Sequence, residues 1–234
     1  MLEIYYISLS LLVVLIITFG FNSMLKTKYP SSTERLKHTL KAPLLLGSWL
    51  FYVYLVSTLG LLQGFELPPR VLIFFFIPTL VGITFFIRKY RNHSLMNALP
   101  KSWAIYFQSF RIFVELIIWK TYLAGTFPVS MSFEGYNYEI LVGLSAPIIA
   151  YLVFNRKILS EKIAIAWNFV GLFVLSIIIG IAVTSAYFPQ LWGASNSLIG
   201  IEFGLFPYTL LAGFLAPMAI FMHILSLSQL FKRK

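Results

Sequence analysis

Three polar residues recur along the apolar segment Trp103–Gly125, where charged side chains are least expected. Gln108, Arg111 and Glu115 follow one another at spacings of three and four residues. At the 100° per residue of an α-helix, Glu115 lies about 20° around the axis from Gln108 and about 40° from Arg111. The three therefore form one polar stripe. A charge at the centre of a bilayer costs at least about 2.5–3.5 kcal/mol, so we expect the stripe to face a bundle interior or a wet cavity.

This stripe supports two interpretations. In the first, it is a binding or transport site, where Arg111 anchors an anion or a substrate carboxylate through its planar fork. Glu115 would then be its counter-ion and a proton carrier. In the second, Arg111 and Glu115 are an ion pair four residues apart that locks helix packing. Residue type and spacing indicate that the stripe matters to the interior of the bundle, and they leave both interpretations open.

Two later apolar segments each hold one strongly polar residue at a similar depth. These are Asn168 and His223. We expect both to approach Arg111, where together with Gln108 they would orient a bound ligand. The simpler alternative is that His223 is a hydrogen-bonded packing residue, because one histidine alone does not make a site.

A second group of polar residues is expected at the outer mouth of the bundle. Lys120 lies five residues after Glu115 and about 140° around the helix from it. Its long stem can reach the lipid headgroups, or its ammonium group can pair with Glu134 or Glu139. Asn137 lies in the same connection as Glu134 and Glu139, residues 126–139, and is assigned to the same mouth.

Missing residue types exclude several chemistries. The chain has no Cys, which removes disulfides, thiol catalysis and cysteine-ligated metal sites. All eight acids are Glu, which argues against Asp-rich magnesium sites and aspartyl proteolysis. His223 is the single histidine in an apolar segment, too few for a bis-histidine haem or a tetrahedral zinc site. The last apolar segment has no Lys to hold retinal. We therefore expect no metal and no cofactor.

The elements that position these residues are apolar helices. The 234 residues are 59% hydrophobic and 11% charged, whereas soluble domains carry about 25% charged residues. A bilayer core needs about 20 helical residues. Seven segments meet or approach that length: 4–21, 42–63, 71–87, 103–125, 140–154, 163–186 and 205–226. The fifth is short and is allowed to begin earlier, within Tyr136–Glu139. The prediction is an all-α fold, a polytopic bundle of seven transmembrane helices in one domain, residues 1–234.

The basic residues predict the orientation of this bundle. Fifteen of the 18 Lys and Arg residues lie in alternate connections and the C-terminal tail. The positive-inside rule then places the N-terminus outside and the C-terminus in the cytosol. Glu3 stands where a signal peptide carries bases, so we expect residues 4–21 to be a retained first helix. The bases face lipid headgroups, and no basic soluble module is present to bind nucleic acid.

Residues 100–230 contain a series of polar and aromatic motifs. They are Gln108-x-Phe110-Arg111-x-x-Val114-Glu115, Met131-x-Phe133-x-Gly135-x-Asn137, Trp167-Asn168-x-x-Gly171-Leu172, Phe206-Pro207-Tyr208 and His223-x-x-Ser226. In these motifs the chain resembles an uncharacterised family of bacterial seven-helix integral membrane proteins with no known activity. The resemblance implies a multi-pass protein of the cell membrane, the bacterial inner membrane. It implies no activity, but it suggests that these polar residues belong to one pattern.

Three functions fit these observations. The leading hypothesis is a protein that binds or translocates a small polar solute or ion, as a transporter or channel-like component. The second is a non-catalytic sensor or accessory subunit with a membrane protein partner. The third is an enzyme acting on lipids through Glu115 and His223, which is weakened because those residues are expected at different depths.

Overall fold

Helices account for most of the computed structural model, which describes residues 2–26, 28–93, 96 and 98–231. Over those residues, seven helical rods follow the seven predicted segments. The rods are α1 (Leu2–Leu25), α3 (Lys41–Thr58), η1–α4 (Leu72–Phe76 and Ile77–Tyr90), α6–η2–α7 (Trp103–Phe107, Gln108–Phe110 and Arg111–Leu123), α8–η4 (Glu139–Ala150 and Tyr151–Asn155), α9 (Glu161–Tyr187) and η7–α10 (Leu211–Leu215 and Ala216–Leu230). The short helix α2 (Ser32–Thr39) leads into α3. No strand occurs in the part of the chain that the structure describes.

Five of the helices in these described ranges are long and apolar enough to cross a membrane. They are Leu2–Leu25, Ser32–Thr58, Leu72–Tyr90, Glu161–Tyr187 and Leu211–Leu230. The α8–η4 rod, Glu139–Asn155, is a shorter apolar helix. The remaining rod is interrupted by one turn of 3₁₀-helix, Gln108–Phe110, where the polar stripe begins. This is the helical architecture expected of a protein that crosses a bilayer several times.

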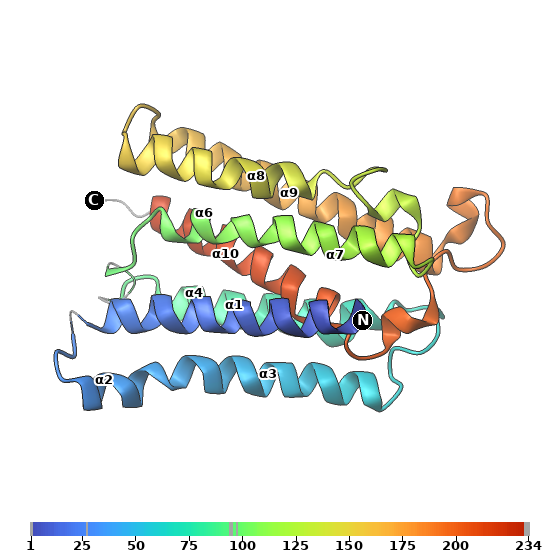
Figure 1. The fold of residues 1–234 in the computed structure, drawn as a ribbon, viewed down its shortest axis with the longest axis horizontal. Coiled ribbons are helices and arrows are strands. Elements are labelled where there is room, and N and C mark those ends of the chain that lie inside the picture. The colour runs from blue at the N-terminus through green and yellow to red at the C-terminus, as the bar shows by residue number, and fades with distance from the viewer. Residues whose placement is uncertain (1, 27, 94–95, 97, 232–234) are drawn as a thin grey trace.

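The seven rods run side by side, and η7–α10 occupies the middle of the bundle (Figure 1). Helix α10 packs against α9, α6 and α4, and η7 packs against α3, η1 and α1. In the most apolar 18-residue stretch of this rod, 67% is buried inside the structure, against at most 33% in the corresponding stretches of the other four candidate spans. Its polar side chains are therefore the ones best shielded from the surroundings.

The basic connections gather at one end of the bundle. The α1–α2 connection, the α4–α6 connection and the α8–α9 turn lie at the end where the chain finishes, and the N-terminus lies toward the opposite end (Figure 1). The three basic residues of the tail, Lys232, Arg233 and Lys234, lie outside the described residues.

Several rods begin or end at other residues than the sequence predicted, and the first continues to Leu25 rather than Phe21. The second rod ends at Thr58 rather than Gln63, because Gly60 turns the chain with a left-handed φ of 69°. The last rod begins at Leu211 and continues to Leu230, several residues later at both ends than predicted. The fifth rod begins at Glu139, within the range Tyr136–Glu139 in which an earlier start was expected.

A turn of π-helix, η1, precedes Pro78 in the third rod. Proline has no N–H, so the carbonyl of Phe74, four residues earlier, loses its helical partner. The hydroxyl of Tyr52 on α3 donates a hydrogen bond to that carbonyl at 2.9 Å. The neighbouring helix thus satisfies a backbone group that would otherwise be unpaired in an apolar interior.

The last rod repeats this arrangement at Pro217, which follows the π-helical turn η7. Pro217 leaves the carbonyl of Gly213 without its helical donor, and the indole N–H of Trp49 donates to that oxygen at 2.7 Å. Both π-helical turns widen their helices at the level where an internal cavity is found, described below. Phe76 of η1 and Leu211, Ala212 and Leu215 of η7 line that cavity.

Candidate functional site

Arg111 is buried where α7, α8 and α10 meet. Its guanidinium forms an ion pair with Glu139, the first residue of α8. It also lies 3.0 Å from His223 of α10, measured from Nη1 to Nε2. None of these three residues is more than 3% exposed. The second interpretation placed an ion pair between Arg111 and Glu115 on one helix. The structure instead pairs Arg111 with Glu139, which connects α7 to α8.

His223 extends this contact into a chain of hydrogen bonds. A guanidinium only donates, so Nε2 of His223 accepts and Nδ1 carries the proton. Nδ1 donates to Oδ1 of Asn168 on α9 at 2.9 Å, and Nδ2 of Asn168 donates to the hydroxyl of Ser226 at 3.0 Å. With both ring nitrogens engaged, His223 is a neutral connector between Arg111 and α9.

Small residues permit these helices to approach so closely. A Cβ at Gly171 of α9 would overlap the imidazole ring of His223, and a Cβ at Gly143 of α8 would press on Ile112 beside Arg111. Gln108 donates from Nε2 to the carbonyl of Ala219 at 3.0 Å. The structure therefore brings together Gln108, Arg111, Asn168 and His223, which the sequence grouped by depth.

Glu115 lies one turn beyond Arg111 and is held by a loop residue. Asn137 donates from Nδ2 to Oε2 of Glu115 at 2.6 Å and to the carbonyl of Met131 at 2.9 Å. Its Oδ1 accepts from the backbone N–H of Glu139 at 3.1 Å. Asn137 thus fixes both carboxylates at once, one through its amide N–H and the other through the start of its helix.

The predicted outer mouth divides into two pairs. Asn137 and Glu139 were expected at the surface, but they are buried at 2% and 3% exposure. The loop folds inward because Gly135 packs directly on the backbone of Val129, where a Cβ would not fit. The other two, Lys120 and Glu134, are exposed as expected.

Lys120 pairs with neither predicted glutamate in the described part of the chain. Its ammonium group lies 5.5 Å from the ring centroid of Tyr5, a cation–π distance. Glu134 instead accepts a hydrogen bond from the indole of Trp119 at 2.8 Å.

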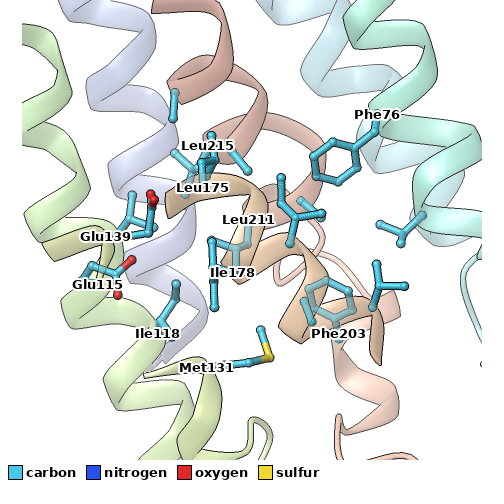
Figure 2. A pocket seen from close by; sticks show the side chains of 18 of the residues that line it. Phe76, Glu115, Ile118, Met131, Glu139, Leu175, Ile178, Phe203, Leu211 and Leu215 are labelled. Atoms are coloured by element: carbon cyan, nitrogen blue, oxygen red, sulfur yellow. The ribbon is translucent and has the colours of Figure 1, made fainter. Parts of the chain in front are cut away.

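An internal cavity of about 80 Å³, partly open to the surroundings, lies beside Arg111 and the two carboxylates. Its other walls are apolar side chains of α7, α9, η1 and η7, with Met131 and Phe203 from the loops. Figure 2 shows Glu115 and Glu139 on one side, with Phe76 and Phe203 across from them. We call Arg111, Glu115 and Glu139 the charged wall of this cavity.

The charged wall is incompletely paired. Among the described residues, Nε of Arg111 and Oε1 of Glu139 are buried without a hydrogen-bond partner. Leaving such a group unpaired costs about 1–3 kcal/mol, and more when it is charged. Two carboxylates against one guanidinium also leave an excess of negative charge when all three groups are ionised. No cluster of three or more metal-ligating side chains occurs within the described ranges.

No protein-family model matches this chain, and neither a curated protein nor a solved structure matches it. The resemblance drawn from residues 100–230 therefore stays a prediction. The residues of that pattern do meet in space, since Arg111, Asn137, Asn168, His223 and Ser226 all take part in the contacts described above.

Sequence reasoning missed one central feature, the ion pair of Arg111 with Glu139. The signal available was the position of Glu139 directly before an apolar segment that is too short by itself. Starting that helix earlier carries Glu139 into the bundle, where only a buried base can be its partner.

Proposed function

We propose that this chain is an integral membrane protein that binds a small solute at the charged wall of its cavity and moves or senses it. The observation that carries the proposal is the joining of an apolar cavity to Arg111, Glu115 and Glu139, none more than 3% exposed. Intramembrane charges kept at such cost are characteristic of substrate and ion pathways.

The proposal includes seven membrane spans, an outer N-terminus and a cytosolic C-terminus. Support comes from the alternation of basic connections along the chain and from the seven helical rods that lie side by side. Trp103–Leu123 and Glu139–Asn155 would complete the five longer candidate spans. Their most strongly polar inward residues are buried against neighbouring helices, so these segments can cross a bilayer as part of the bundle; these residues are Gln108, Arg111, Glu115 and Glu139.

Contacts at the charged wall favour a cation or a proton as the bound charge. Arg111 already contacts Glu139 and His223, so an anion at its unpaired Nε would lie beside the Glu139 carboxylate and be repelled by it. Glu115 has an amide as its described partner and is the group better placed to receive a new donor. Both nitrogens of His223 are occupied, which disfavours the lipid-acting enzyme because it removes the candidate base.

A thermal-shift screen of purified protein in detergent tests this proposal. The compounds are inorganic cations, amines, amino acids, organic acids and lipids, applied to wild type, Glu115→Gln and the matched control Glu134→Gln. A ligand that binds only the folded state raises the melting temperature, by an amount that grows with its concentration over Kd. We expect a compound that stabilises wild type and Glu134→Gln but not Glu115→Gln.

Two results would contradict the proposal. One is equal stabilisation of all three proteins by every active compound, which would place binding elsewhere. The other is no stabilisation by any compound class, together with a Glu115→Gln protein as stable as wild type.

A further inference from the structure

The cavity is almost entirely apolar away from its charged wall, and this limits what can occupy it. Leu175, Ile178, Leu211 and Leu215 line it close to the carboxylates, and Phe203 closes the far side (Figure 2). A compact polar solute would pair with the wall but would leave these side chains in contact with nothing that prefers them. A molecule with an apolar body satisfies both regions.

The open side of the cavity faces out of the bundle rather than along its axis. Phe76 of η1 and Ile179 and Val183 of α9 line the cavity and remain partly exposed. All three belong to segments in the half of the bundle toward which the N-terminus lies (Figure 1). If the rods span a bilayer, this opening meets the acyl chains of the outer leaflet.

The polar groups on the wall determine the head group. Glu115 has one described donor, Asn137, and Oε1 of Glu139 has none. When all three groups are ionised, the wall carries one more negative than positive charge. An ammonium group supplies up to three N–H donors and one positive charge, so it pairs the unpaired acceptor and neutralises the excess charge together. A carboxylate or phosphate head would instead add negative charge to a buried acidic wall.

We infer that the occupant is an amphiphile with an amine head group and a single apolar tail, taken laterally from the outer leaflet between η1 and α9. This inference rests on the proposed function and narrows its substrate class. The head lies against Glu115 and Glu139, and the tail lies along Ile178 and Leu211 toward the opening.

Photolabelling in lipid nanodiscs tests the inference. The probe is an alkyl amine with a diazirine in its tail, applied to the full chain in zwitterionic phospholipid and mapped by peptide mass spectrometry. Competitors of equal chain length are dodecylamine, dodecanol and dodecanoate. We expect adducts on α9 and η1 at the cavity, displaced at least tenfold more effectively by dodecylamine than by either other competitor.

Variants separate the cavity from the lipid-facing surface. Glu115→Gln should reduce labelling about tenfold while its amide oxygen keeps the hydrogen bond from Asn137. Ala182→Phe, which fills the cavity, should abolish labelling. Ala166→Phe makes the same change at an exposed position of the same helix and should leave labelling unchanged. If Ala182→Phe does not fold, Ile179→Phe at the opening replaces it.

Either of two results overturns the inference: equal competition by alcohol and acid, or labelling spread over lipid-facing helices in every variant. If a compact solute stabilises the protein through Glu115 while amine labelling is unspecific, the proposed function stands and only this inference falls. If no compound depends on Glu115 in either experiment, both fall.

Discussion

Arg111 and Glu139 form the contact on which the buried site depends most. Removing one member of a buried ion pair leaves an uncompensated charge and typically costs about 3–5 kcal/mol, whereas replacing both costs much less. Arg111→Met should therefore destabilise the protein by that amount. Adding Glu139→Gln in the same chain should recover more than half of the loss. Denaturant unfolding in detergent measures the free energy of unfolding of wild type, of each single variant and of the double variant.

A separate single variant guards against a trivial result. Glu134→Gln removes an exposed carboxylate from the preceding loop and should change stability by less than about 1 kcal/mol. Additive losses from Arg111→Met and Glu139→Gln would contradict a direct pair, since residues that do not interact show additive effects.

Gly171 determines how closely α9 approaches His223. A Cβ at this position overlaps the imidazole ring, so Gly171→Ala must displace His223 or separate α9 from α10. Overpacking of this kind costs about 1–3 kcal/mol, and we expect a loss of that size in the melting profile.

Gly180 of the same helix provides the matched control. Nothing lies within 4 Å of a Cβ built there, so Gly180→Ala gains helix propensity, up to about 1 kcal/mol. Equal effects of the two glycine substitutions would show that the close contact at His223 does not limit packing.

Helix α3 acts on the last rod by serving a carbonyl that proline leaves free. Trp49→Phe removes the donor to the carbonyl of Gly213, and interhelical hydrogen bonds in membranes contribute about 0.6–1.7 kcal/mol. In a Pro217→Ala background the new N–H of residue 217 can take that carbonyl. Trp49→Phe should therefore cost less there, giving a coupling energy of about 0.6–1.7 kcal/mol in a double-mutant cycle.

The indole also packs against its surroundings, but the cycle subtracts packing that is common to both backgrounds. The parallel substitution beside Pro78 is Tyr52→Phe, which keeps the ring and removes only the hydroxyl that donates to the carbonyl of Phe74. If Trp49→Phe costs the same with and without Pro217, the indole is not compensating for the proline.

At the scale of elements, much of the fold follows from hydrophobic runs, and their ends do not. Each predicted segment overlaps one helical rod, because about 20 apolar residues leave a membrane chain few other options. Gly60 and the start of α8 at Glu139 shifted the boundaries, since local turns and a buried charge act on single residues. The depth of Arg111, Asn168 and His223 was readable from the sequence. The inward fold of Asn137 was not, because loop geometry has no periodic signal.

The whole molecule makes a topological prediction that the absence of cysteine makes simple to test. Single cysteines at Ser31 and Ser160, both exposed near basic connections, should be protected from a membrane-impermeant maleimide in intact cells. A cysteine at the exposed Ser195 should react. Permeabilisation should make all three react, which shows that each thiol is accessible. The opposite pattern would invert the orientation, and labelling of all three in intact cells would contradict seven spans.

The central claim is that one small molecule occupies the cavity against Glu115. Native mass spectrometry of the protein purified from its own membrane measures this directly, comparing wild type with Glu115→Gln, Ala182→Phe, Glu134→Gln and Ala166→Phe. We predict one bound molecule per chain in wild type and in the last two variants, and its loss in the first two. An adduct pattern that is identical in all five proteins, or no adduct in any of them even after added amine, would contradict the claim.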